Sequence, residues 1–269
     1  MSQPHAQTVK DVMDPARAEA CAAVLDRPAP TDTLPPFWHH LHFWDVQSGT
    51  RLGRDGHVAR GVGMIPDLGL PRRMWAGGHV EFMSPLSFGQ VATRRTTLRD
   101  IHRKTGRSGP LALVTLVHEI GQGDILRLRE RQTLVYREDP SPDALELIVP
   151  PAPEADVEET RIFDALTLMR YSALTMNAHR IHWDESYATG VEGHAGLVVH
   201  GPLLVEGLID LATRYVGPLA TIDYRATSPA IANETLTFCL RHGGPTSLAT
   251  AFVRGADGGL RMTAEVRPA

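Results

Sequence analysis

A single apolar helix with a well-marked start, followed by a series of strand-like runs, is the feature that most constrains how this chain can fold. The spacing predicts a helix from Pro202 to Tyr215, because Gly201 precedes a proline in the first helical position and leucines form a nearly continuous apolar stripe. Strand-like runs follow at Leu219 to Ala226, Thr235 to Arg241, Leu248 to Arg254 and Leu260 to Val266. One buried helix followed by an antiparallel meander is found in several α+β folds.

The first half of the chain has the same predicted order of helix and strands, without a direct sequence repeat between the halves. Apolar residues at intervals of three and four predict a helix from Gln7 to Leu25, and the aromatic segment Pro36 to Val46 favours another turn or two of helix. Alternating apolar and polar residues then predict antiparallel strands with one face in water. These runs are His79 to Met83, Gln90 to His102, Leu111 to Gly121 and Leu126 to Arg137, with hairpin turns at Thr105 to Gly109 and Gly121 to Asp124.

A Pro-rich and acidic stretch from Glu138 to Thr160 separates the two halves, with its seam near Pro150. We therefore predict two domains, residues 1–150 and 151–269. The predicted fold class is α+β, and the architecture is a double hot-dog, in which each unit is a long helix wrapped by a curved antiparallel sheet. A chain of 269 residues is long enough for two such units side by side.

Composition excludes several classes of function. The net charge is −4 and the basic residues do not form long runs, which argues against nucleic acid or an anionic membrane surface as a partner. The two cysteines, Cys21 and Cys239, are too few for a disulfide framework and suit a reducing compartment. The N-terminus lacks an export signal, and polar residues interrupt the most apolar window, Ala195 to Ala212. We expect a cytoplasmic protein without a membrane span.

The segment from Tyr171 to Asp184 carries the residues best suited to chemistry. Asn177 and His182 lie on a short polar turn next to strand-like sequence, where an imidazole and a nearby amide can hold and deprotonate a water molecule. His200 and Gly201 precede the apolar helix, whose free backbone amides and positive dipole end can stabilise a developing oxyanion. Glycine there lets a substrate approach closely, so these residues form half of an acyl-thioester site.

This pattern resembles the MaoC-like hydratases, whose motif runs Gly-Asp-x-Asn-Pro-Ile-His before an Ala-His-Gly helix start. Asn177 stands in the place of the family's catalytic Asp, His179 of its Asn, Arg180 of its Pro and His182 of its catalytic His. The variant is similar to the two-hot-dog branch that includes mesaconyl-CoA and itaconyl-CoA hydratases and mitochondrial hydroxyacyl-thioester dehydratases. The run from Pro71 to Gly78 looks like the degenerate N-terminal hot-dog of that branch.

The resemblance implies a hydro-lyase that adds water to an enoyl-CoA thioester with a short C5 dicarboxylyl chain of the itaconyl or mesaconyl type. It implies a coenzyme A ester as partner, neither a metal nor another cofactor, and a single active site in the second half, while a homodimer is compatible with the symmetry of the fold. An Asn amide can orient water but cannot act as a base. His182 is therefore predicted to take the proton, Asn177 to position the water and the Gly201 amide to hold the enolate.

Several of the predicted substrate-binding residues have two possible interpretations. Arg72, Arg73 and Trp75 either grip coenzyme A phosphates and adenine or belong to a surface loop with an anchoring tryptophan. Arg180 binds a substrate carboxylate or pairs with a neighbouring acid. Tyr171 and His200 complete the predicted substrate-binding set, and the second proton carrier, Asp184 or Glu185, is left unassigned.

Other functions remain as alternatives. They are dehydration of a 3-hydroxyacyl group on acyl carrier protein, a hot-dog thioesterase, and a catalytically silent acyl-thioester binding module. The spacing of His179 and His182 is compatible with a metal, but a third ligand is not visible in the sequence. His39, His40 and His42 are expected to be packing or surface residues rather than ligands.

Overall fold

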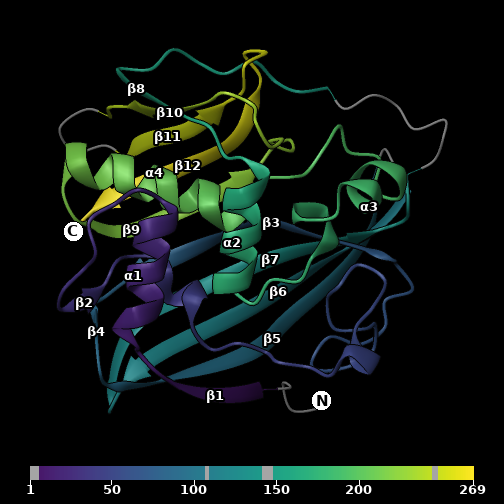
Figure 1. Cartoon of the computed structure of the whole chain (residues 1–269), viewed down its shortest axis with the longest axis horizontal. Coiled ribbons are helices and arrows are strands. Elements are labelled where there is room, and N and C mark those ends of the chain that lie inside the picture. The colour runs from purple at the N-terminus through teal and green to yellow at the C-terminus, as the bar shows by residue number, and fades with distance from the viewer. Residues whose placement is uncertain (1–5, 107–108, 141–147, 244–247) are drawn as a thin grey trace.

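One antiparallel sheet of ten strands passes through both halves of the chain, as a computed structural model shows (Figure 1). The structure describes residues 6–106, 109–140, 148–243 and 248–269. The strand order is β1-β5-β6-β7-β3-β9-β12-β11-β10-β8. Strands of the first half therefore lie on one side of the β3–β9 junction and strands of the second half on the other.

The elements of the first half are β1 (Ala6–Val12), α1 (Pro15–Val24), β2 (Thr33–Leu34), η1 (Trp38–Leu41), η2 (Gly49–Arg51), β3 (Arg72–Phe82), β4 (Leu86–Ser87), β5 (Val91–Gly106), β6 (Gly109–Gln122) and β7 (Ile125–Arg137). Those of the second half are β8 (Val157–Arg161), α2 (Ala165–Leu174), η3 (Arg180–His182), α3 (Glu185–Gly190), α4 (Gly201–Val216), β9 (Leu219–Ala226), β10 (Leu236–Arg241), β11 (Ala249–Arg254) and β12 (Leu260–Pro268). β2 and β4 pair separately.

Helix α4 is the centre of the second half, and its predicted position is confirmed. It lies across β9 to β12 (Figure 1), with apolar side chains on most of its circumference. Gly207 brings the helix backbone against the ring of Phe238 on β10, where a Cβ atom would overlap that ring. The fully apolar stripe explains why this helix is enclosed by the sheet rather than lying on its surface.

The first half differs from the second in what covers its sheet. In the described residues its longest helix is α1, which has ten residues and packs against α2 rather than along the sheet. The irregular segment 43–71 supplies Leu68 and Leu70, which pack on Ala112, Val114 and other residues of β6 and β7. Glycine and proline are frequent in this segment and no helical period runs through it, so it forms a loop, as predicted. The long helix expected in each hot-dog unit is therefore absent from the described part of the first half.

The helix predicted from Gln7 to Leu25 is wrong over its first half. Residues Ala6–Val12 form β1, which pairs with β5. The helix begins only at Pro15, and the side chain of Asp14 caps it by accepting a hydrogen bond from Ala16 N at 3.0 Å. The β-branched residues Thr8, Val9 and Val12 suit a strand, and Asp-Pro is a typical helix start.

The other predicted elements agree with the structure. The strand-like runs of both halves are strands, although β3 begins at Arg72 rather than at the predicted His79, and Pro36 to Val46 contains the short helix η1. Part of the Thr105 to Gly109 turn and part of the acidic connector, residues 107–108 and 141–147, lie outside the described residues. The two halves share one core, in which Val80 and Ile120 join Leu203, Ile222 and Phe238. The separate duties of residues 1–150 and 151–269 stay a prediction.

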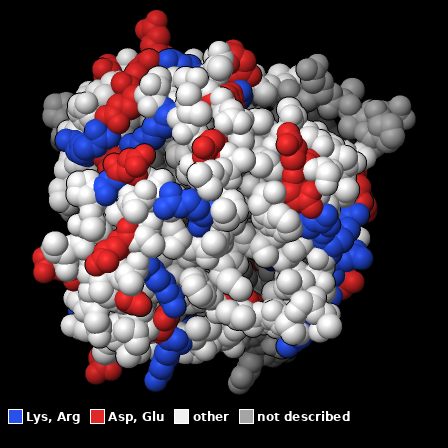
Figure 2. All heavy atoms as spheres, in the orientation of Figure 1, with Lys and Arg blue, Asp and Glu red and all other residues white. Residues whose placement is uncertain are grey.

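Charge on the surface is locally balanced. Figure 2 shows basic and acidic side chains interspersed on the face that it presents. Paired examples are Arg214 with Glu159 at 2.6 Å and Arg161 with Asp210 at 2.7 Å. Both cysteines are free and buried. Among the described residues, the longest apolar helices all fall short of what crossing a membrane requires.

The close approach of α4 to β10 predicts opposite effects for alanine at two helical glycines. Gly207→Ala should lower the free energy of unfolding by about 1–3 kcal/mol, because the new methyl group must displace the Phe238 ring. Gly190→Ala, at the exposed end of α3 with open space around it, should be neutral or stabilising by up to about 1 kcal/mol. Urea unfolding midpoints measure both. Equal midpoints for the two variants would contradict the packing argument.

Candidate active site

His182, at the end of η3, faces the chain that leads into α4. Its Nδ1 lies 2.7 Å from the carbonyl oxygen of Val198, and the Val198 amide donates to Ile181 O at 2.9 Å. A carbonyl oxygen only accepts, so Nδ1 carries the proton and donates it. The lone pair of the imidazole is therefore on Nε2, the nitrogen left to accept a proton from another molecule.

Burial keeps this imidazole neutral. It lowers the pKa of His182 to about 4, which outweighs the opposing effect of the Val198 carbonyl. Burial likewise lowers the pKa of His179 to about 2, with the charges of His182 and Arg73 adding to the effect. At neutral pH both rings are uncharged, and His182 can act as a base.

His200 lies behind His182 rather than on the wall of the cleft. The two rings stack with centroids 3.7 Å apart and an interplanar angle of 19°, and His200 is 0% exposed. Its Nε2 is hydrogen-bonded to Ser172 Oγ at 2.8 Å, and the Tyr171 ring meets it edge-on at 4.9 Å. His200, Ser172 and Tyr171 thus support the orientation of His182. The substrate contacts predicted for His200 and Tyr171 stay predictions.

Asn177 follows a tight turn at the end of α2. Met176 adopts a left-handed φ of 51°, and the Asn177 amide donates to Ser172 O at 2.9 Å. The side-chain Oδ1 accepts from His179 N at 3.1 Å. These bonds hold the Asn177 side chain beside the same cleft that His182 lines. Its side-chain nitrogen, Nδ2, makes no hydrogen bond to the described residues.

Gly201 is the first residue of α4 and lies against an aromatic ring. A Cβ atom there would overlap Trp75, whose ring stacks on Tyr224 with centroids 4.7 Å apart. Only glycine fits under this ring, and Gly201 and Trp75 both line the cleft. Trp75 lies on β3, so of the two interpretations of Arg72, Arg73 and Trp75 the surface loop is wrong, and contact with coenzyme A stays a prediction.

A loop of the first half contacts the motif, a contact that sequence reasoning missed. Gly56, with φ 87°, packs against the Ala178 carbonyl, and Arg180 N donates to Asp55 O at 2.9 Å. His57 follows, with its ring centroid 4.6 Å from that of His179. The glycine-rich sequence of residues 53–57 with its single histidine was the available signal.

The arginines predicted to bind substrate differ in what they contact. Arg180 donates to Asp184 at 2.6 and 3.0 Å and covers the Tyr187 ring, which matches the salt-bridge reading. Arg72 is 2% exposed and donates to the side chain and carbonyl of Glu192 at 2.5 and 3.0 Å. Both guanidinium groups are engaged within the protein.

Asp184 and Glu185 are poor proton carriers for this site. Asp184 caps α3, and hydrogen bonds from Ser186, Arg180 and the Tyr187 amide lower its pKa to about 2. Glu185 is exposed on α3. A carboxylate held this firmly in its charged form does not donate a proton near neutral pH.

The cleft itself has a volume of about 2270 Å³ and draws on both halves. Asn177, His179, His182 and Gly201 line it from the second half, and His57, Arg73 and Trp75 line it from the first. A neutral imidazole, the Asn177 side-chain amide and the N-terminal residue of α4 thus line one cleft. This arrangement can hold a water molecule and stabilise an oxyanion.

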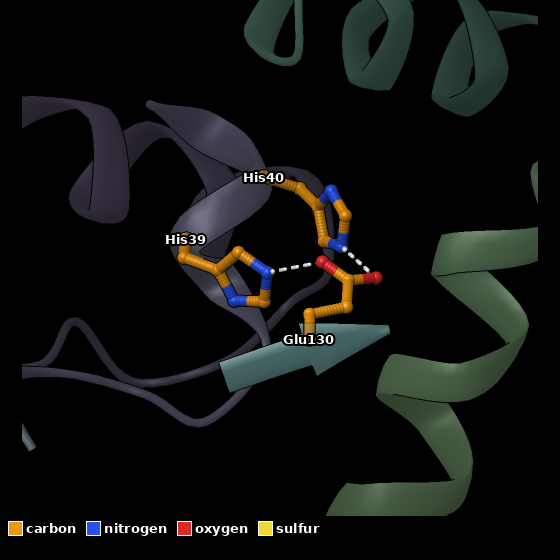
Figure 3. A group of neighbouring side chains, drawn as sticks. All are labelled: His39, His40 and Glu130. Carbon is orange, nitrogen blue, oxygen red and sulfur yellow. Dashed lines mark hydrogen bonds and ion pairs between the residues drawn. The ribbon is translucent and has the colours of Figure 1, made fainter. Parts of the chain in front are cut away.

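A second polar cluster lies farther along β7, where His39 and His40 meet Glu130 (Figure 3). His39 Nε2 lies 2.9 Å and His40 Nε2 3.5 Å from the carboxylate, and Tyr224 donates to it at 2.9 Å. Burial would raise the pKa of Glu130, but contact with both histidines holds it well below the usual range. These residue types can hold a metal. Here they anchor Tyr224 beneath Trp75. His42 is buried against Asp11 and Arg17.

Comparison with known proteins supports the interpretation of the chain as an acyl-thioester hydratase or dehydratase. Residues 37–232 match the family model described as hydroxyacyl-thioester dehydratase type 2. The chain is 40% identical to mesaconyl-C(4)-CoA hydratase of Chloroflexus aurantiacus, over 97% of this chain and 94% of that protein.

Solved structures show the same fold. HtdX of Mycobacterium tuberculosis superposes with a TM-score of 0.71 at 18% identity, over 98% of this chain and 100% of that one. A second M. tuberculosis protein, described as a double hotdog fold, gives 0.57 at 14% identity, over 99% and 96%. The predicted double hot-dog is confirmed. The chain therefore belongs to the hydroxyacyl-thioester dehydratase type 2 family of MaoC-like hot-dog proteins and is a hydro-lyase.

Proposed function

We propose that this protein hydrates the double bond of a short enoyl-CoA thioester, with His182 as the base. The observation that carries the proposal is the hydrogen bond from His182 Nδ1 to Val198 O, which leaves the lone pair of a neutral imidazole on Nε2. A general base must present a free lone pair to the proton that it removes. The family assignment supports the reaction class, and the relative named for mesaconyl-C(4)-CoA supports a C5 dicarboxylyl chain carried on coenzyme A.

Each step can be assigned to residues of the cleft. Asn177 orients a water molecule, and His182 Nε2 takes one of its protons as the oxygen bonds to the β-carbon. The electron pair of the double bond moves onto the thioester oxygen, which the Gly201 amide at the N-terminus of α4 stabilises. His182 returns the proton to the α-carbon, so that H and OH have been added and the base is restored. The reverse sequence dehydrates a 3-hydroxyacyl thioester.

We assign different duties to the two halves. Residues 151–269 supply His182, Asn177 and Gly201, and residues 1–150 shape the acyl pocket and grip the carrier. The contact of Gly56 and His57 with the catalytic segment and the position of Trp75 over Gly201 support this division. The arginines of the first half would also suit acyl carrier protein. A pull-down with acyl carrier protein distinguishes the two carriers, because retention of this protein would favour acyl carrier protein over coenzyme A.

His182→Ala should reduce kcat/KM for hydration about 10²- to 10⁴-fold, because the variant loses the general base. His102→Ala, on the exposed part of β5, is the matched control and should keep wild-type activity. Loss of enoyl absorbance with crotonyl-, mesaconyl- and itaconyl-CoA measures the reaction. Release of free thiol instead would identify a thioesterase, and near-normal turnover by His182→Ala would remove this residue from the mechanism.

The pH profile provides an independent check on the buried base. Protonation abolishes the lone pair of His182, so kcat/KM should fall as the pH decreases through about 4 and stay level from there to neutrality. A solvated histidine would instead give a midpoint of about 6.5. Buried neutral histidines also take up protons on unfolding below about pH 6.5, which lowers stability in acid. Circular dichroism should therefore be recorded at each pH, and an unchanged spectrum where activity falls excludes unfolding as the cause.

A further inference from the structure

Arg73 has no acidic partner among the described residues. Of the other arginines that line the cleft, Arg72 pairs with Glu192 and Arg261 with Glu234, whereas Arg94 and Arg137 are half-buried and, like Arg73, without an acidic partner in the described part of the chain. Arg73 is half-buried and lines the cleft. A cation that is partly withdrawn from water and unpaired costs free energy unless a ligand supplies the counter-charge.

The position of Arg73 on β3 directs it toward the catalytic end of the cleft. Residues two apart on a strand point to the same side, so Arg73 shares its side with Trp75, whose ring covers Gly201. Pairing is regular here, with Arg73 opposite Tyr136 and Trp75 opposite Leu134. Both partners belong to an apolar cluster. Arg73 is thus a charged group beside an otherwise apolar wall.

The charge of Arg73 also reaches the histidines beside the catalytic base. It contributes to the lowered pKa of both His57 and His179, although burial is the larger cause for each. The His179 ring in turn meets the His182 ring edge-on, with centroids 5.6 Å apart. Arg73, His179 and His182 thus line the same cleft, and a negative group on a substrate bound there would face the charge of Arg73.

The chemistry of the proposed substrate class requires a cation at that place. In a mesaconyl group joined to coenzyme A through C4, the free carboxylate is attached to the β-carbon, the same carbon that receives water. The carboxylate must lie next to the attacking oxygen, where its negative charge opposes the approach of an electron-rich nucleophile. A guanidinium both neutralises that charge and fixes the carboxylate through two parallel hydrogen bonds.

We propose that Arg73 binds the free carboxylate of a β-carboxy enoyl thioester and thereby selects dicarboxylyl over monocarboxylyl substrates. The inference rests on the proposed hydration. It assigns Arg73 to the acyl group rather than to the coenzyme A phosphates.

The test compares an acid with an uncharged isostere. C4-linked mesaconyl-CoA and 3-methylcrotonyl-CoA differ only in a carboxylate replaced by a methyl group. Arg73→Gln should reduce kcat/KM for the first about 10- to 100-fold, the effect of losing a charge-assisted hydrogen-bonded pair, and change the second less than about threefold. Arg73→Lys should restore part of the loss. Arg99→Gln, at an exposed position on β5, is the matched control and should leave both values unchanged.

A binding measurement keeps this test separate from the reaction. The saturated esters C4-linked methylsuccinyl-CoA and isovaleryl-CoA cannot be hydrated, and titration calorimetry gives their dissociation constants. Arg73→Gln should raise the dissociation constant of the methylsuccinyl ester only. If the variant weakens both esters equally, Arg73 holds the coenzyme A portion and the inference is wrong; if it weakens neither, Arg73 binds no part of the ligand. If the wild-type protein binds the methylsuccinyl ester selectively but hydrates neither enoyl ester, the proposed hydration is wrong and carboxylate binding by Arg73 still stands.

Discussion

Enclosure of helix α4 is the constraint on which the rest of the structure depends. Its apolar side chains cover most of its surface, so the helix can be stable only if the sheet closes around it. Gly207 allows the sheet to approach as far as the Phe238 ring. Burying the helix body leaves its N-terminus as the one end directed into the cleft, which places Gly201 beside His182 and Trp75. The same packing that stabilises the second half thus brings the N-terminus of α4 to the cleft, where we propose that Gly201 holds the oxyanion.

The irregular segment 43–71 gives the first half a different role. In place of a long helix, it packs Leu68 and Leu70 on the sheet and directs residues 53–57 against the catalytic segment. A helix over the same strands would fill this space with its own side chains. The loop leaves a cleft that β3 borders with Arg73 and Trp75. The two halves therefore share one core but contribute different chemistry to it.

Buried polar groups connect the substrate wall to the interior. Glu130 receives hydrogen bonds from His39 and Tyr224, Tyr224 stacks on Trp75, and Trp75 covers Gly201. On another side of the site the Tyr171 ring meets His200 edge-on, and His200 stacks on His182. In both, a side chain fixed by several partners holds the next one, which is how a site keeps its geometry before substrate arrives. Each depends on residues far apart in the chain, such as His39 and Glu130.

Local pattern was enough to predict what depends on near neighbours. The apolar stripe of α4 and the alternation of the strands predicted the elements and hence the fold class, and the spacing of Asn177, His182 and Gly201 predicted residues that the structure brings to one cleft. The strand at Ala6–Val12 was mistaken for helix because a short run of spaced apolar residues fits both periods, and only pairing with β5 decided between them. Tertiary structure alone decided the partners: Val198 for His182, Asp184 for Arg180, Glu192 for Arg72, and the approach of His57. Hydrogen bonds, ion pairs and desolvation depend on distance in space, which separation along the chain does not reveal.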